Sequence, residues 1–141
     1  MRPRCFALLS VVWGLPLTLC GLLAAVSLTA AGYRPARYHG TWLFRVGHHW
    51  GGLGLGPVLI VSADASDRLC RHELGHAIQN CRYGPMILPL VLLSAIRYHL
   101  RRRRIRRGLP LTPYDSWRFE GEATRLGTAA VAADRNREES L

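Results

Sequence analysis

The sequence predicts a mainly α-helical protein that begins with a transmembrane helix. Residues 5–31 contain no charged side chain and are flanked by arginines on both sides. Residues 67–83 place apolar side chains at a helical spacing and end at a Gly-Pro pair. A single β-branched run, residues 57–62, predicts one short strand. A short apolar segment over residues 85–96 and a C-terminal helix complete the expected fold.

The first 32 residues are predicted to form the membrane anchor. A helix of about 20 residues crosses the hydrocarbon of a bilayer, and the uncharged run of 27 residues is longer than the apolar core of a signal peptide. The alternative is a secretory signal that is cleaved near Ala31. The rest of the chain is expected to form one compact domain over residues 33–127, followed by a frayed tail over residues 128–141.

Residues 32–56 are rich in glycine, histidine and aromatic side chains and show no sustained periodicity. They are therefore predicted to form a loop, with Trp42, Phe44 and Trp50 suited to a membrane interface. The strand at residues 57–62 follows this loop and is expected to lie beside the next helix.

That next helix carries the pattern H-E-x-x-H, formed by His72, Glu73 and His76. Residues 72 and 76 lie one turn apart on the same helix face, so both imidazoles can reach one metal ion, with Glu73 about 100° round the helix. The pattern indicates a Zn²⁺ site in which the two imidazoles hold the ion and Glu73 accepts a proton from water. The alternative is a histidine pair in the core or in solvent, beside an unrelated glutamate.

The motif helix is too polar to lie inside a bilayer. Ser66 or Asp67 can cap its start and Gly84-Pro85 can end it. Its charged side chains would each cost roughly 2.5 to 3.5 kcal/mol at the bilayer centre. The apolar segment at residues 85–96 would give a helix of about 18 Å, shorter than a hydrocarbon core of about 30 Å. We therefore expect this segment to be interfacial or re-entrant, which keeps the downstream residues on the same side as the motif.

A C-terminal helix is predicted to begin at Thr112 as cap with Pro113 in the first turn, and to end at Gly127. A catalytic zinc usually takes three protein ligands, and this helix offers the third. Glu120 shares the apolar face with Trp117, whereas Glu122 lies about 200° away and is expected to face solvent. Glu120 is therefore the predicted third ligand. A surface carboxylate paired with Arg118 or Arg125 is the alternative for Glu120.

The run from His72 to Gln79, with Gly75 before the second histidine, resembles the zincin metallopeptidases. Together with Tyr83-Gly84-Pro85 it is similar to small bacterial membrane-associated proteins of that type, over about residues 50–127. The resemblance implies that His72 and His76 are metal ligands and that Glu73 is the catalytic base.

The same resemblance implies neighbours for these residues. It implies a strand along the cleft, at residues 57–62, that pairs with an extended substrate; a strand that only covers the motif helix is the alternative. It also matches Glu120 to the E-x-x-x-D helix of zincins with a glutamate ligand. Thr124 stands where those proteins have an acidic residue that orients a histidine, and its hydroxyl is expected to accept from a ring N–H.

The large positive charge of the chain does not by itself decide which class of partner it binds. The net charge is +10, and all nineteen basic residues are arginines. No aromatic-interleaved basic surface or nucleic-acid-binding motif accompanies them, so no nucleic-acid partner is predicted. The densest run is expected to bind anionic lipid at a bacterial cell membrane. It consists of Arg101, Arg102, Arg103, Arg104, Arg106 and Arg107.

These features predict a membrane-anchored zinc-dependent metallopeptidase or other hydrolase that acts on peptide or protein at the membrane surface. Two alternatives stay open: a membrane protein with a structural zinc site, and a membrane protein that binds anionic lipid or a partner through its arginines. A donor to the reaction's oxyanion is also needed. Tyr83, His99, Tyr114 and Arg118 are its candidates, and the sequence does not choose among them.

Overall fold

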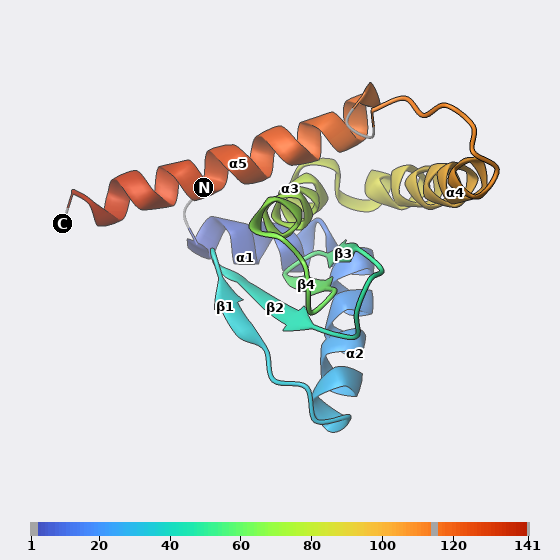
Figure 1. Cartoon of the computed structure of the whole chain (residues 1–141). Coiled ribbons are helices and arrows are strands. Elements are labelled where there is room, and N and C mark those ends of the chain that lie inside the picture. Colours follow the sequence, from blue (N-terminus) through green and yellow to red (C-terminus); the bar gives the residue numbers. More distant parts are fainter. Residues whose placement is uncertain (1–2, 114–115, 141) are drawn as a thin grey trace.

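The computed structural model describes residues 3–113 and 116–140, with side chains from residue 8 onward. Helix α3 lies at the centre, with α5 across one side of it, a small sheet on the other, and α4 projecting from its end (Figure 1). The elements are, in order, α1 (Pro3–Val12), α2 (Leu15–Ala30), β1 (Ala36–Tyr38), β2 (Thr41–Arg45), β3 (Gly52–Leu55), β4 (Val58–Val61), α3 (Asp67–Tyr83), the 3₁₀ turn η1 (Gly84–Met86), α4 (Ile87–Arg106) and α5 (Arg118–Glu138).

The prediction of an N-terminal transmembrane helix is wrong. The apolar run forms two helices, α1 and α2, which part at Trp13 and Gly14. Gly14 is buried against Asn80 of α3, whose amide donates to the Gly14 carbonyl and to the Thr18 hydroxyl. Within the described residues, every helix falls short of the length or the apolarity that crossing a membrane requires. Leu17 is buried, but many other apolar side chains of the run, among them Leu8, Val12 and Leu23, stay exposed.

The sheet has four strands where one was predicted. Its order is β1-β2-β4-β3, with β2 and β4 parallel and the other pairs antiparallel. The predicted loop at residues 32–56 contains three of these strands, and their glycines and arginines hide the period-two pattern. β4 is paired on both sides, so the expected pairing of this strand with a substrate is excluded, and β3 is the edge strand next to α3.

The motif helix is confirmed, as are both of its ends. The Ser66 hydroxyl accepts from the backbone N–H of Leu69 at 3.3 Å, and Gly84 ends the helix with a positive φ of 55°. The buried face of α3 contains both Leu74 and the polar motif residues.

The segment at residues 85–96 does not form a short separate element. Helix α4 continues through it into the arginine run, for 20 residues. Pro89 is accommodated because it is the third residue of α4, where a backbone N–H has no partner within the helix. Many apolar side chains of α4 stay exposed, among them Leu92, Leu93 and Ile96.

The C-terminal helix begins later and ends later than predicted. It starts at Arg118, whereas Thr112 and Pro113 lie in an irregular segment before it. It continues through Gly127, the predicted stop, and through most of the predicted frayed tail to Glu138. Gly127 serves a different purpose, because a Cβ at this position would lie 1.7 Å from the Arg71 carbonyl oxygen of α3.

Gly75 of α3 lies at the same crossing of α3 and α5 and faces the backbone of α5. A Cβ on Gly75 would lie 1.8 Å from the carbonyl oxygen of Ala123 in α5. The two glycines therefore let the backbones of α3 and α5 approach more closely than any side chain would allow. This close crossing brings Glu120 of α5 next to the histidines of α3.

Candidate metal centre

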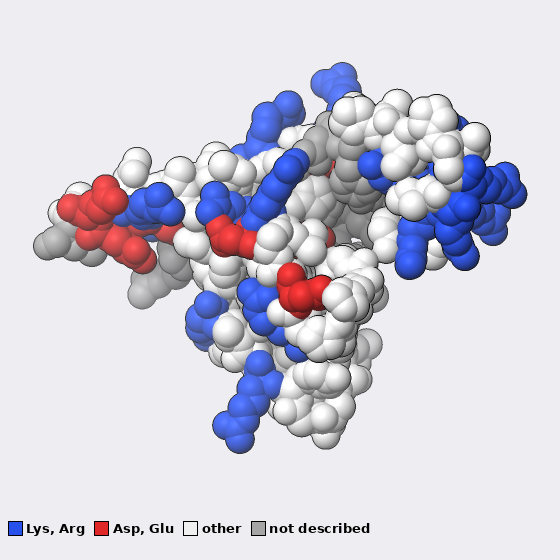
Figure 2. Space-filling view, in the orientation of Figure 1, with Lys and Arg blue, Asp and Glu red and all other residues white. Residues whose placement is uncertain are grey.

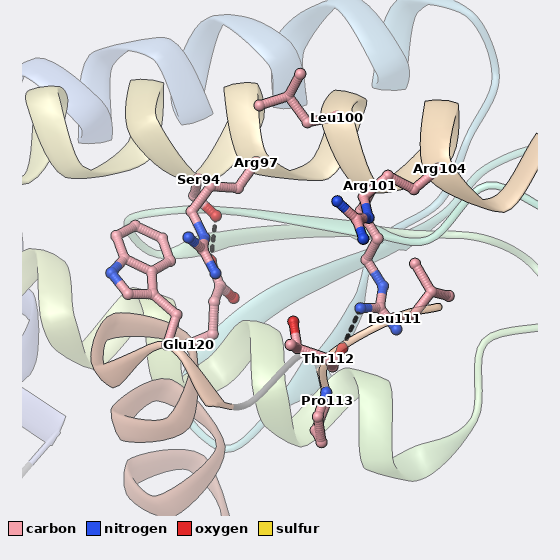
Figure 3. Close-up of a pocket in the computed structure, with 10 residues that line it drawn as sticks. Ser94, Arg97, Leu100, Arg101, Arg104, Leu111, Thr112, Pro113 and Glu120 are labelled. Carbon is pink, nitrogen blue, oxygen red and sulfur yellow. Dashed lines mark hydrogen bonds between the residues drawn. The ribbon is translucent and has the colours of Figure 1, made fainter. Parts of the chain in front are cut away.

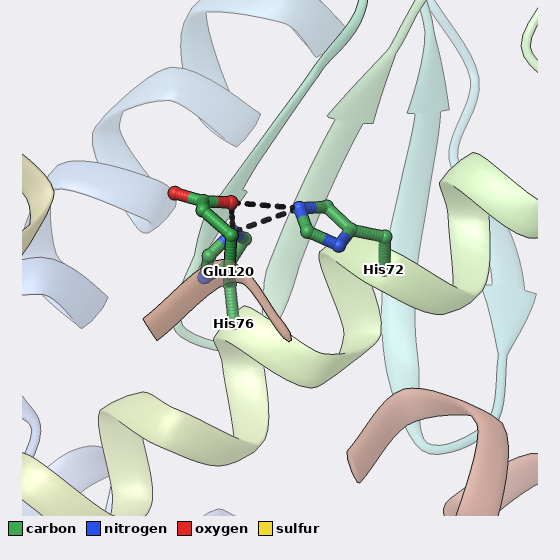
Figure 4. A group of neighbouring side chains, drawn as sticks. All are labelled: His72, His76 and Glu120. Atoms are coloured by element: carbon green, nitrogen blue, oxygen red, sulfur yellow. Dashed lines mark hydrogen bonds and ion pairs between the residues drawn. The ribbon is translucent and has the colours of Figure 1, made fainter. Parts of the chain in front are cut away.

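His72 and His76 project from the same face of α3, and Glu120 reaches them from the start of α5 (Figure 4). One carboxylate oxygen of Glu120 lies 3.1 Å from Nε2 of His72 and 3.3 Å from Nε2 of His76. The two Nε2 atoms are 3.2 Å apart. Two imidazole nitrogens and one carboxylate oxygen thus form a nearly equilateral triangle.

This triangle fits a metal ion. Donors about 2.0–2.1 Å from a tetrahedral ion lie about 3.3 Å from one another, and the three measured separations run from 3.1 to 3.3 Å. The donor set, two imidazoles and a carboxylate, is also the one that leaves a fourth position open in catalytic sites. His72, His76 and Glu120 can therefore hold a metal ion together.

The other nitrogen of each ring is held by a neighbour. His72 Nδ1 lies 2.9 Å from the Thr124 hydroxyl, which itself donates to the Glu120 carbonyl. His76 Nδ1 lies 2.9 Å from the Gln79 side-chain oxygen. When each Nδ1–H donates to its partner, Nε2 carries the lone pair that a metal requires. The predicted contact of Thr124 with a histidine ring is confirmed.

Gln79 is itself fixed from the α5 side. It is fully buried, and its amide donates to the Phe119 carbonyl at 2.8 Å and to the Glu122 carboxylate at 2.9 Å. Glu122 also accepts from Arg82 and from the Tyr83 hydroxyl. The prediction that Glu122 faces solvent is therefore wrong, because the start of α5 turns this residue toward the end of α3.

Glu120 is almost completely buried, yet it is held in its charged form. Burial by itself would raise the pKa of this carboxyl, but hydrogen bonds to His72, His76 and the Ser94 hydroxyl outweigh it and hold the pKa far below its usual range. Ser94 lies on α4, so three helices meet at this one carboxylate. The alternative of a surface carboxylate paired with Arg118 or Arg125 does not describe a side chain that is 2% exposed.

Glu73 lies beside the triangle, against the edge strand β3. A Cβ on Gly52 would lie 2.6 Å from a Glu73 carboxylate oxygen, and one on Gly54 would lie 2.8 Å from the Glu73 carbonyl oxygen. The absence of a side chain at Gly52 leaves room for the carboxylate, and its absence at Gly54 lets β3 approach the backbone of α3. Burial raises the pKa of Glu73 above its usual value, although the nearby His76 and His72 partly oppose this.

A cavity of about 260 Å³ opens onto these residues. His72, His76 and Glu73 form one wall, β3 forms another, and α4 covers them with Val91, Ser94 and Tyr98. The Tyr98 hydroxyl donates to the Trp50 carbonyl at 3.1 Å. A small, mostly apolar space therefore faces the two histidines and the carboxylate of Glu73.

The sequence missed three residues of this site. Ser94 and Tyr98 come from α4, which periodicity alone could not bring over α3, and the role of Gln79 depends on its contact with α5. Of the predicted oxyanion donors, Tyr83 bonds to Glu122 instead, and Tyr114 lies outside the described residues. His99 and Arg118 are exposed, and neither is among the residues that line the cavity.

Comparison with known proteins adds no relative: the chain matches no protein-family model, no curated protein and no solved structure. The function must therefore be inferred from the chemistry of this site.

Proposed function

We propose that this protein is a zinc-dependent hydrolase that cleaves peptide or protein substrates. The observation that supports it is the triangle of donors from His72, His76 and Glu120, with Glu73 buried beside it. A structural zinc site is usually closed by four protein ligands. Here, among the described residues, three donors form the cluster, and two of them, His72 and His76, line a cavity.

Each residue then has a chemical task. Zinc bound here would supply a Lewis acid that lowers the pKa of water toward neutrality and polarises a carbonyl group. Glu73 accepts the proton of the attacking water at its carboxylate and returns it to the leaving amine. Its raised pKa suits a group that must take up and release a proton near neutral pH.

The walls of the cavity favour an extended, partly apolar substrate. β3 is the edge strand of the sheet and lines the cavity through residues 52–54, so its backbone can pair with an extended peptide. Val91, Ala95 and Phe119 offer apolar contacts to a side chain next to the scissile bond. Tyr98 is placed to donate to the oxyanion once its hydroxyl leaves the Trp50 carbonyl.

Replacing Glu73 by Gln tests the proposal. The variant should keep one zinc per chain and lose at least about 100-fold in kcat on a peptide library, because the amide cannot accept the proton. Glu138→Gln, at the exposed end of α5, is the matched control and should retain full activity. Metal content is measured by mass spectrometry and cleavage by peptide mapping.

The same experiment separates the enzyme from a structural zinc protein. A purified protein that holds zinc and cleaves none of the library, with the Glu73→Gln variant indistinguishable from it, would contradict the hydrolase and favour the structural site. A protein that binds iron in preference to zinc would contradict the assignment of the metal.

We also propose that the protein works at an anionic membrane surface. Exposed apolar side chains continue along α4 into its arginines, and Figure 2 shows basic side chains gathered at the far end of this helix. Such a surface suits an interfacial helix, with apolar contacts to acyl chains and arginines at anionic headgroups. The apolar residues are Leu88, Leu92, Leu93, Ile96 and Leu100.

Vesicle sedimentation checks this surface. The protein should bind vesicles that contain phosphatidylglycerol and should bind pure phosphatidylcholine at least about tenfold more weakly. Leu92→Glu with Leu93→Glu should abolish binding, because two carboxylates would enter the acyl region. Equal binding of this double variant and the wild type would exclude α4 as the contact surface.

A further inference from the structure

The two carboxylate oxygens of Glu120 have different partners. Oε2 faces the histidine pair, at 3.1 Å from Nε2 of His72 and 3.3 Å from Nε2 of His76. Oε1 accepts a hydrogen bond from the Ser94 hydroxyl (Figure 3). In Figure 4 this second oxygen points away from His72. The carboxylate therefore presents one oxygen to the group that could hold a metal ion.

Helix α4 positions Ser94 over the site. Ser94 lies one turn before Tyr98, on the same face of α4, and both residues line the cavity of the metal centre. The Tyr98 hydroxyl donates to the Trp50 carbonyl, just before β3. Two side-chain hydrogen bonds from successive turns thus hold α4 in place, one to α5 through Glu120 and one to the segment before β3.

The bond from Ser94 matters because Glu120 is buried. A carboxylate can bind a metal ion through one oxygen or through both. A buried oxygen without a hydrogen-bond partner is unfavourable, and Glu120 is only 2% exposed, so bulk water is a poor substitute for Ser94. Without the Ser94 hydroxyl, Oε1 could satisfy itself by binding the same ion as Oε2.

We propose that Ser94 is a positioning residue that restricts Glu120 to a single metal-binding oxygen. The inference rests on the proposed binding of an ion by His72, His76 and Glu120, but not on hydrolysis. With one oxygen from Glu120 the protein supplies three donors, and the position that a catalytic ion keeps for water stays open. With both oxygens it would supply four, and water would have to enter as a fifth ligand. Ser94 thus preserves the open site.

Cobalt(II) absorption tests the number of ligands in the full-length protein. Cobalt binds the same nitrogen and oxygen donors as zinc, and its visible bands weaken as the coordination number rises from four to five. Ser94→Ala should still bind one cobalt per chain. Its visible absorption should be at least about twofold weaker than that of the wild type, because the second oxygen of Glu120 joins the ligands.

Two further substitutions separate the hydroxyl from the packing of α4. Ser94→Thr keeps the hydroxyl and should retain the wild-type absorption. Ser94→Val has the shape of threonine without the hydroxyl, so it should behave as Ser94→Ala does. Ser27→Ala is the matched control, because it removes a hydroxyl that bonds only within α2, to the Leu23 carbonyl, and it should change nothing.

Each outcome decides the proposal. Equal absorption of Ser94→Ala and the wild type at full cobalt occupancy would overturn it, as would a weakening that Ser94→Thr and Ser94→Val share equally. A wild-type protein that binds no cobalt would overturn it together with the metal centre. If the expected difference is found and no peptide is cleaved, the role of Ser94 is supported and only the hydrolase is contradicted.

Discussion

At the scale of the residue, the site is organised by the second nitrogen of each histidine. Thr124 and Gln79 each hold an Nδ1 atom at 2.9 Å, which directs the two Nε2 atoms toward Glu120. Thr124 carries no charge, so it orients His72 through a neutral hydroxyl and not through a carboxylate. The charged carboxylate of Glu122 does not contact His76 itself but accepts a hydrogen bond from Gln79, which does. His72 is therefore oriented by a hydroxyl group, and His76 by an amide that is bonded to a carboxylate.

Zinc affinity should fall as the pH decreases through the neutral range. Burial lowers the pKa of His76, but its hydrogen bond to Glu120 and the charge of Glu73 outweigh this, so the pKa is raised above the ordinary 6.5. In metal-free protein the bound proton must leave before zinc can bind. Weakening should therefore begin above pH 6.5, by roughly tenfold per pH unit for each proton released.

Competition with a chromophoric zinc chelator between about pH 5.5 and 8 measures this profile. Replacing His39, which pairs with Asp134 away from the site, by Gln should leave the profile unchanged. An affinity that is constant across this range would show that no imidazole binds the ion.

At the scale of the element, the metal centre depends on how closely α3 and α5 cross. Its three candidate donors come from both helices, and a displacement of one helix by the width of a methyl group would separate Glu120 from the histidines. Gly75 and Gly127 make the crossing possible from opposite helices. The glycine within the motif is thus explained by packing.

Gly75→Ala should destabilise the protein and weaken zinc binding together. The new methyl group would overlap the Ala123 carbonyl, which must move, and such overpacking typically costs about 1–3 kcal/mol. Thermal unfolding and zinc titration measure the two effects. Thr128→Ala, exposed on α5, is the control and should change both by little. If the Gly75 variant kept its zinc affinity, the close crossing would not be what assembles the site.

At the scale of the whole molecule, α3 packs on most of the other elements that the structure describes. It packs on α5, β3, β4 and α1, and its buried face carries Asn80 and Cys81 toward the N-terminal helices. The arginines, in contrast, gather at the far end of α4. The molecule thus separates a buried, polar centre from a basic and apolar extension.

Local sequence signals predicted the parts of this fold that one helix determines. Ser66 and Gly84 mark the ends of α3, and the shared face of Trp117 and Glu120 identified the carboxylate that completes a group able to hold a metal ion. The transmembrane prediction failed because composition gives the apolarity of a run but not where a helix ends, and this run breaks into two helices at Trp13 and Gly14. The prediction that the C-terminal helix ends at Gly127 was wrong because glycine occurs both at helix ends and where two helices cross closely. Ser94 could not be found, because its role depends on the path of α4.

X-ray absorption at the zinc edge, with metal content measured on the same sample, shows whether His72, His76 and Glu120 hold zinc. One zinc per chain is expected, with nitrogen and oxygen ligands at about 2.0–2.1 Å and the multiple scattering of two imidazoles. His72→Ala, His76→Ala and Glu120→Gln should each reduce the bound zinc. A protein without stoichiometric metal, or a sulfur shell at about 2.3 Å, would exclude this zinc site.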